Sequence, residues 1–401
     1  MANNNNKDKC NVPHLRFPEF TGEWKKSTIG NLSTKVGSGV TPRGGETVYK
    51  SEGHSFVRSQ NVGWGHLQLD DIAFIDKETH LRQKNTELQL DDVLLNITGA
   101  SIGRSALVNK QIAGGNVNQH VCIIRTKDNL VPAFLCNFLL SNHGQKQIDS
   151  FQAGGNRQGL NFEQIRSIKI TIPSTKEQTK IATLLHLIDE RIATQNKIIE
   201  DLKKLKSAII EMEYTHKTKS NSHIGDFIEQ TSKRNKNRAI QNVLSVSNRQ
   251  GFIQQSEQFE NRSVASDDTS SYKIVKNNNF AFNPARINVG SIARLTTFDR
   301  GIVSPMYICF RTKDTLFPEY LDYYFETKQF FTEIQKRLEG SVRQCLSFEG
   351  LCNIPLCIPT IEVQQQVGKQ LSTLVQEIKL EIDFLELLQR QKKFLLHQMF
   401  I

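Results

Sequence analysis

Several signatures of export and of metal binding are missing from this 401-residue sequence. The seven cysteines are scattered and contain no Cys-x-x-Cys pair, which argues against a disulfide framework and a structural zinc. The ten histidines form no His-x-x-x-His or His-Glu-x-x-His group, so we expect no metal site. No apolar run approaches the ~18 residues that cross a bilayer, and the polar residues 1–10 do not resemble a signal peptide. We therefore expect a cytoplasmic protein with no membrane partner.

Nucleotide-binding motifs are absent as well. The sequence has no Gly-x-x-x-x-Gly-Lys-Ser/Thr loop, so nothing indicates ATP hydrolysis. No Gly-x-Gly-x-x-Gly follows a predicted strand, so a dinucleotide or adenosyl cofactor site is unsupported. We therefore expect a chain with no catalytic residues, no metal ligands and no cofactor of its own.

The composition favours a folded protein with a polyanionic partner. With 38% hydrophobic and 23% charged residues, the chain can build hydrophobic cores, and its length suits two or three domains. Lys and Arg number 51 against 41 Asp and Glu, which gives a formal net charge of +10. Such an excess is typical of nucleic-acid-binding proteins, although charge alone does not identify the partner.

The sequence contains an internal duplication. The segment 125–128, Arg-Thr-Lys-Asp, recurs at 311–314, an offset of 186 residues (311 minus 125). Upstream, Ile29-Gly30 matches Ile224-Gly225 if the second copy is about nine residues shorter (195 minus 186). A constant offset over many positions indicates two copies of one structural unit. Further pairs at the offset of 186 are Leu130/Leu316, Pro132/Pro318, Leu135/Leu321, Arg157-Gln158/Arg343-Gln344, Phe162-Glu163/Phe348-Glu349 and Pro173/Pro359.

Each copy ends in a long predicted helix with the same apolar repeat. Apolar residues recur at alternating steps of four and three, the 3.5-residue period of a coiled coil. We predict that the two helices pair with each other; the alternative is that each packs as a surface helix on its own domain. Ser174 and Glu177 resemble a capping box at the first helix start. The seam residues are Ile181, Leu185, Ile188, Ile192, Ile199, Leu202, Ile209, Val367, Leu371, Leu374, Ile378, Leu385, Leu388 and Leu395.

Before each helix lies a unit that we predict to be α/β (mixed α+β) with short strands. Helices should follow Pro132 and Pro318, because proline suits the first helical turn. The predicted strands are Phe56–Val62, Asp92–Ile97, Val121–Arg125, Ile168–Ile172, Ala239–Val246, Asn279–Phe282, Ile308–Arg311 and Ile354–Ile358. The predicted organisation is a first domain at 1–172, a helix at 173–216, a second domain at 217–358 and a helix at 359–401.

Loop segments carry basic and amide side chains suited to DNA. Residues 217–249 hold seven Lys or Arg and two Asp or Glu, a net charge of +5 (seven minus two). Basic groups bind phosphates, whereas Asn, Gln and Arg can hydrogen-bond to base edges; a single exposed Arg or Asn, however, is usually only solvated. Base readout should also differ between the two copies. The candidate DNA-binding residues are Arg58, Gln60, Asn61, Arg104, Asn116, Asn118, Gln119, Arg157, Gln158, Lys233, Arg234, Lys236, Arg238, Arg249, Asn283, Arg286, Arg294, Arg343 and Gln344.

Taken together, these segments resemble the specificity subunit of a type I restriction-modification system. The opening of the first unit, Trp24 to Gly30 and Gly37 to Pro42, resembles the start of a target-recognition domain. Asp91 to Gly103 resembles the characteristic strand and turn of that domain, and Gly155 to Phe162 resembles its junction with the long helix. The order of domain, helix, domain and helix matches the family over nearly the whole chain.

The resemblance implies two target-recognition domains related by a pseudo-twofold axis and an antiparallel coiled-coil pair of helices. It implies that each domain reads one half of a bipartite site on double-stranded DNA, while the helix pair sets the spacer. It also implies two methyltransferase subunits and two restriction (translocase–nuclease) subunits as partners. Those partners would hold the S-adenosylmethionine, ATP and Mg²⁺. This chain would then be non-catalytic and would direct adenine methylation and restriction.

Two other classes remain open at this stage. A stand-alone DNA-modifying enzyme would need a catalytic motif, and none is found in the sequence. A coiled-coil scaffold that binds no nucleic acid would leave the basic loops without a role. Salt-insensitive, negligible DNA affinity at low ionic strength would favour the scaffold.

Overall fold

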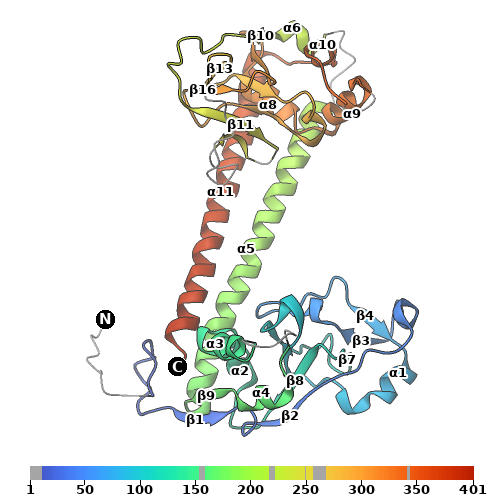
Figure 1. Cartoon of the computed structure of the whole chain (residues 1–401), viewed down its shortest axis with the longest axis vertical. Coiled ribbons are helices and arrows are strands. Elements are labelled where there is room, and N and C mark those ends of the chain that lie inside the picture. The colour runs from blue at the N-terminus through green and yellow to red at the C-terminus, as the bar shows by residue number, and fades with distance from the viewer. Residues whose placement is uncertain (1–10, 153–158, 216–221, 249, 256–267, 341–343) are drawn as a thin grey trace. The chain divides into compact units, whose positions relative to one another are not determined.

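The computed structural model describes residues 11–152, 159–215, 222–248, 250–255, 268–340 and 344–401. The chain divides into two compact units (Figure 1). The first contains residues 1–197 and 383–401, and the second contains residues 198–382. Both long helices, α5 (Thr175–Thr215) and α11 (Ile361–Gln398), contribute residues to each unit.

The first unit contains two small sheets and one additional strand pair. One sheet has the strand order β2-β8-β5-β6, the other has the order β4-β3-β7, and β1 pairs with β9. Strands β3 and β7 run parallel, whereas the other pairs are antiparallel. The strands are β1 (Lys25–Thr28), β2 (Ser33–Ser38), β3 (His54–Val57), β4 (Ala73–Ile75), β5 (Val93–Asn96), β6 (Ser105–Leu107), β7 (Asn116–Val117), β8 (Val121–Thr126) and β9 (Lys169–Ile172). The helices before α5 are α1 (Lys77–Arg82), α2 (Pro132–Leu140), α3 (Asn142–Ser150) and α4 (Phe162–Ser167).

The central strand β5 is buried on both faces. Val93 and Leu95 belong to the core that the four-stranded sheet forms with α2 and α5. Leu94, on the opposite face, belongs to a second core with Val57 and Val117 of the three-stranded sheet. Successive strand residues point to opposite faces, so a strand between two cores is apolar throughout, which accounts for the Val-Leu-Leu run.

The second unit repeats this topology. Its sheet β10-β17-β14-β15 corresponds strand by strand to β2-β8-β5-β6, and its sheet β12-β11-β16-β13 has one strand more than β4-β3-β7. Strands β11 and β16 run parallel, as β3 and β7 do. The strands are β10 (Ile228–Thr231), β11 (Val243–Ser247), β12 (Gly251–Gln254), β13 (Lys273–Lys276), β14 (Phe280–Phe282), β15 (Ile292–Arg294), β16 (Arg300–Val303) and β17 (Ile308–Thr312). The helices are α6 (Ile224–Phe227), α8 (Pro318–Tyr324), α9 (Lys328–Arg337) and α10 (Phe348–Cys352).

A buried glutamine holds the first turn of each long helix. The side-chain oxygen of Gln178 accepts a hydrogen bond from the Val131 amide at 2.9 Å. Its amide nitrogen donates to the carbonyl oxygens of Asn129 at 3.1 Å and Pro173 at 3.0 Å. Gln364 makes the same three bonds to the residues 186 positions further on, namely Phe317, Thr315 and Pro359. The glutamine therefore fixes where each long helix leaves its unit, in both copies.

The matched glycines also occupy one structural position. The Gly30 amide donates to the Arg166 carbonyl, and a Cβ on Gly30 would lie 2.9 Å from the Arg166 Cβ. A Cβ on Gly225 would lie 2.8 Å from the Cβ of Cys352, the residue 186 positions after Arg166. Glycine is required here because the chain passes too close to α4 or α10 for a side chain.

The repeated Arg-Thr-Lys-Asp segment has a structural role. The Nζ atom of Lys127 donates to the Asn31 carbonyl, and that of Lys313 donates to the Asp226 carbonyl. Arg125 forms a bidentate pair with the buried Asp92, at 2.7 Å for both bonds. The lysine contact is therefore shared by the two copies, whereas the arginine contact is not, because Arg311 pairs with Glu229.

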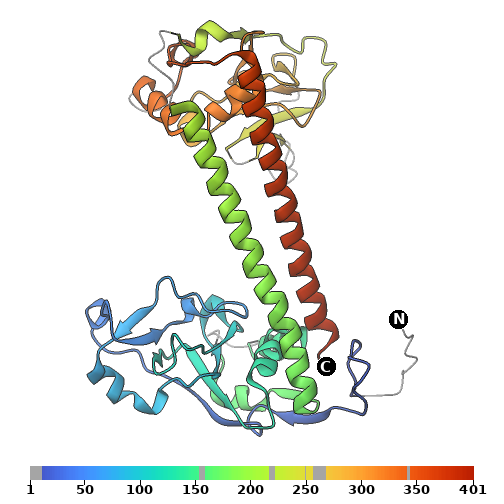
Figure 2. The ribbon, with the colours of Figure 1, turned by 180° about the vertical axis from the view of Figure 1, so that it is seen from behind.

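Within each unit, α5 and α11 lie side by side (Figure 2). In the first unit, Leu185 from the start of α5 and Leu395 from the end of α11 belong to one core. In the second unit, Ile210 near the end of α5 and Leu371 near the start of α11 belong to one core. The helices are therefore antiparallel, and the mixed α/β fold with a paired-helix arrangement is confirmed.

The predicted seam residues are withdrawn from solvent. Nine are buried, and the other five are half-buried: Ile192, Leu202, Ile209, Leu374 and Leu385. By contrast, Leu187 and Leu387 are 57% and 59% exposed. The 3.5-residue pattern therefore distinguishes the inner face of each helix from its outer face.

Several local predictions were wrong. Ile354–Ile358 forms no strand; only Pro355 makes an isolated bridge, to His223, because proline lacks the amide that a ladder needs. Strand β11 begins at Val243 rather than Ala239, and β3 ends at Val57. Glu177 is not the reciprocal partner of a capping box, because its carboxylate is buried against Arg16 and Trp24.

Candidate nucleic-acid interface

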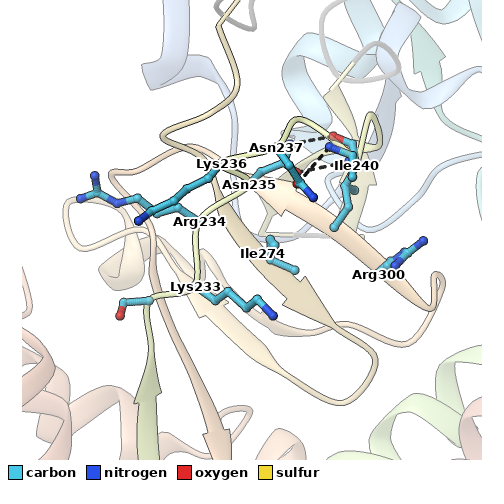
Figure 3. A pocket seen from close by; sticks show the side chains of 10 residues that line it. Lys233, Arg234, Asn235, Lys236, Asn237, Ile240, Ile274 and Arg300 are labelled. Atoms are coloured by element: carbon cyan, nitrogen blue, oxygen red, sulfur yellow. Dashed lines mark hydrogen bonds between the residues drawn. The ribbon is translucent and has the colours of Figure 1, made fainter.

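A basic loop in the second unit, residues 232–240, connects β10 to β11. It lines an open cavity of about 810 Å³ together with Ile274 and Arg300. Lys233, Arg234 and Lys236 are exposed, and Figure 3 shows Arg234 and Lys236 extending to the same side of the loop. Closely spaced cations on an open surface form a site for phosphate groups.

Asn235 holds this loop in shape from inside. Its side chain is fully buried; its amide nitrogen donates to the Ile240 carbonyl at 2.9 Å, and its oxygen accepts from the Ile240 amide at 3.2 Å (Figure 3). Its backbone amide donates to the Tyr272 carbonyl and its carbonyl accepts from the Arg238 amide. Arg238 has a φ of 53°, the left-handed conformation of a tight turn. The loop is thus fixed around a buried amide while its cations face solvent.

The cations of this loop differ in their partners. Arg238 forms an exposed ion pair with Asp268 at 3.1 Å. Among the described residues, no acidic group lies within salt-bridge distance of Lys233, Arg234 or Lys236. These three charges are therefore the ones available to an anionic ligand. Arg300, at the start of β16, adds a fourth cation that we did not predict, because it is close to the loop only in the fold.

Four amide side chains in the predicted DNA-binding set are buried and bonded within their own units. Asn61 bonds the Arg58 amide and the Gln68 carbonyl. Asn116, fully buried, lies 2.8 Å from His80 Nδ1 and donates to the Gln83 carbonyl. The oxygens of Asn118 and Asn283 accept the backbone amides of His120 and Ala285. These side chains shape loops within their own units, and as DNA contacts the four residues stay predictions.

Arg294, another predicted DNA contact, is paired within its own unit. Its side chain is 10% exposed and pairs with Asp322 at 3.1 Å and Glu319 at 3.4 Å, and it donates to Asn278. Burial raises the pKa of the Asp322 carboxyl above its usual value, and the Arg294 guanidinium opposes that rise. The arginine pairs with two half-buried carboxylates inside the second unit, and as a DNA contact it stays a prediction.

The remaining predicted residues fall into three groups. Arg58 and Gln60 both hydrogen-bond to Asp71, so their side chains are only partly available to DNA. Arg104, Gln119, Arg286 and Gln344 reach solvent and stay predictions as DNA contacts. Arg157, Gln158, Arg249 and Arg343 lie outside the described residues.

Other kinds of site were sought in the same residues. Across residues 11–152, 159–215 and the later described ranges, no three His, Cys, Asp or Glu side chains group as metal ligands would. None of the described helices is both long and apolar enough to cross a membrane. Burial raises the pKa of the Cys122 and Cys309 thiols to about 12, which makes both poor nucleophiles.

Comparison with known proteins finds a similarity to the specificity subunits of type I restriction enzymes. Residues 21–204 match the family model described as the type I restriction modification DNA specificity domain. The putative type I restriction enzyme MjaX specificity subunit of Methanocaldococcus jannaschii is 22% identical over 228 residues, 55% of this chain and 53% of that protein. The EcoBI specificity subunit of Escherichia coli is 28% identical over 170 residues, 42% of this chain and 34% of that protein. The chain therefore spans about half the length of these relatives or less.

Two solved structures resemble this one over almost the full chain. A crystal structure of a type I restriction-modification S subunit from M. genitalium gives a TM-score of 0.59 at 15% identity, covering 97% of this chain and 99% of that one. A structure described under complex assembly and conformational transition of the type I system gives 0.56 at 14% identity, covering 96% and 98%. The resemblance identified from the sequence is confirmed: residues 21–204 match the type I restriction modification DNA specificity domain, and the chain shares the fold of these solved S-subunit structures.

Proposed function

We propose that this chain is the DNA-sequence specificity subunit of a type I restriction-modification complex. The observation that carries the proposal is the match of residues 21–204 to the specificity domain, together with a duplicated fold like that of solved S subunits. The exposed cations of the basic loop 232–240 support a polyanionic ligand. The chain itself is non-catalytic and acts in the cytoplasm.

In this proposal each unit reads one half of a bipartite target on double-stranded DNA. Two different readers in one chain require two half-sites, and the paired helices α5 and α11 set the length of the unread spacer. Two methyltransferase subunits and two restriction subunits complete the complex. They hold the S-adenosylmethionine, Mg²⁺ and ATP and perform adenine methylation and cleavage at the site that this chain selects.

A genome-wide map of methylated adenine tests the function. Cells that express this chain with its methyltransferase subunit should gain methylation at one split motif, two short half-sites around a fixed unspecified gap. The control is the methyltransferase subunit alone. An assembled complex that adds no methylation at any sequence contradicts the proposal.

The role of the basic loop has a separate test. Replacing Lys233, Arg234 and Lys236 by Ala should weaken binding to all sequences and make the slope of log K against log salt shallower by about 2.7, at ~0.9 per phosphate contact. A matched variant replaces three exposed lysines of α11: Lys369, Lys379 and Lys393. If the slope of log K against log salt is the same in both variants and in the wild type, the loop does not contact DNA phosphates.

The spacer role predicts a change of target geometry. Seven residues inserted into each long helix keep the seam in phase and lengthen each by about 10 Å at ~1.5 Å per residue. The methylated motif should then keep both half-sites and gain about three base pairs in the gap, at ~3.4 Å per base pair. An unchanged gap in a folded, active complex contradicts the spacer role.

A further inference from the structure

Several loops of the first unit converge at one end of the sheet β2-β8-β5-β6. The register pairs Ser38, the last residue of β2, with Cys122, and Asn96, the last residue of β5, with Val121, the first of β8. The segments that follow β2 and β5, and the turn that precedes β8, therefore meet at the same end. Arg104 lies there too, because its carbonyl accepts the Asn96 amide at the start of β6.

The turn at residues 118–120 is built to present two polar side chains. The side chain of Asn118 accepts the His120 backbone amide at 3.0 Å and closes the turn. Gln119 is exposed, and its side-chain oxygen accepts the Thr41 amide at 2.9 Å. The Nδ1 atom of His120 lies 2.7 Å from the Thr98 hydroxyl. Both side chains are thus oriented by neighbouring loops rather than left to rotate in solvent.

This orientation leaves hydrogen-bonding groups unused. Within the described part of the chain, the amide nitrogen of Gln119 and the Nε2 atom of His120 have no hydrogen-bond partner. The loop after β2 passes so close to β7 that residue 39 must be glycine, because a Cβ added to Gly39 would lie 1.7 Å from the Val117 carbonyl oxygen. An oriented, exposed amide with an unused donor is a suitable group for a base edge, because base reading needs fixed geometry.

The second unit has the same turn with different chemistry. Ser304, Pro305 and Met306 lie 186 positions after residues 118–120, between β16 and β17 as the first turn lies between β7 and β8. The Tyr307 amide donates to the Ser304 carbonyl, as the Val121 amide donates to the Asn118 carbonyl. Met306 is 57% exposed; the Pro305 side chain has no hydrogen-bonding group, and that of Met306 has only a weakly accepting sulfur. The equivalent turn therefore presents polar groups in the first unit and an apolar surface in the second.

We propose that these two turns are specificity-determining elements, in which Gln119 hydrogen-bonds to an adenine edge and Met306 makes an apolar contact to a base in the other half-site. This inference rests on the proposed function. The unused amide nitrogen of Gln119 matches the N7 acceptor of adenine, and its oxygen, which already accepts the Thr41 amide, has a second lone pair for the N6 donor. An apolar side chain suits the methyl group of thymine. Neutral groups add no salt-dependent attraction, so these turns contribute selectivity while the nearby Arg104 and the basic loop 232–240 supply affinity.

The test is the adenine-methylation motif that the complete modification complex produces with variants of this chain. Gln119→Ala should relax one position in one half-site, with about a 5- to 100-fold loss of discrimination there, and leave the other half unchanged. Met306→Gln should alter only the other half-site. The control is Gln89→Ala, because Gln89 is also an exposed glutamine and precedes β5, at the opposite end of the sheet; the motif of this variant should equal that of the wild type.

The outcomes separate this inference from the proposed function. A wild-type motif that is unchanged by both Gln119→Ala and Met306→Gln, in complexes that methylate normally, overturns the assignment of the turns and leaves the proposed function intact. A uniform loss of methylation at an unaltered motif also overturns it, since that result indicates a contact to the DNA backbone or a structural role. No methylation by the wild-type complex overturns both.

Discussion

The buried Gln178 offers a sharp test of how the first long helix is anchored. Gln178→Ala removes three hydrogen bonds and leaves the Val131 amide and two carbonyl oxygens without their partners. At about 0.5–1.5 kcal/mol for each bond, we expect the free energy of unfolding to fall by about 3 kcal/mol. With a urea m-value of about 1–3 kcal/mol/M, the unfolding midpoint should fall by about 1–3 M.

Tryptophan fluorescence is a suitable assay because both tryptophans, Trp24 and Trp64, belong to the first unit. Trp24 is buried, and its indole donates to Glu177, the neighbour of Gln178. The control is Lys176→Ala, an exposed substitution in the same helical turn, which should change the stability by no more than about 0.5 kcal/mol. If Gln178→Ala unfolds at the same urea concentration as Lys176→Ala, the glutamine does not anchor the helix.

Three further predictions follow from packing and burial. Gly30→Ala should destabilise the first unit by about 1–3 kcal/mol in urea unfolding, whereas Gly37→Ala, with nothing within 4 Å of the new Cβ, should have little effect; equal losses would contradict the close-approach argument. Leu185→Ala on the inner face of α5 should cost about 2–5 kcal/mol and the exposed Leu187→Ala less than about 0.5; similar costs would contradict the assignment of faces. Because its pKa is raised to about 12, Cys122 should stay a neutral thiol in the folded protein at pH 8 and react with a thiol reagent only after unfolding, as mass spectrometry can measure; rapid labelling of the native protein would refute this.

The sequence was most informative where a pattern was duplicated. The offset of 186 residues identified equivalent positions such as Pro132 and Pro318, and a helix begins at each of them. The spacing of apolar residues indicated the inner faces of α5 and α11, because a long helix must cover one face continuously. Such features depend on local sequence and periodicity, which can be read without knowing the tertiary contacts.

The candidate site was less predictable, because residue type does not determine burial. Asn116 and Arg294 have the chemistry of DNA contacts, yet each is enclosed by partners distant in sequence. Arg300 lines the basic cavity only because β16 pairs with β13, which lies against the basic loop. The offset makes Gln119 and Pro305 equivalent, but only the fold shows that both lie in turns that precede equivalent strands, β8 and β17.

The participation of α11 in the first unit has a consequence for biosynthesis. Phe400 is fully buried, with its ring centroid 5.0 Å from that of Phe134, and Leu395 and Met399 belong to the same core. A ribosome must therefore complete the whole second unit before the first can close its core. Until then, the apolar side chains that receive Phe400 are exposed on the nascent chain, where they can recruit chaperones or cause aggregation. The half of the protein that is translated first should consequently be the last to reach its native state, and a small deletion near residue 400 should damage the distant N-terminal half of the sequence.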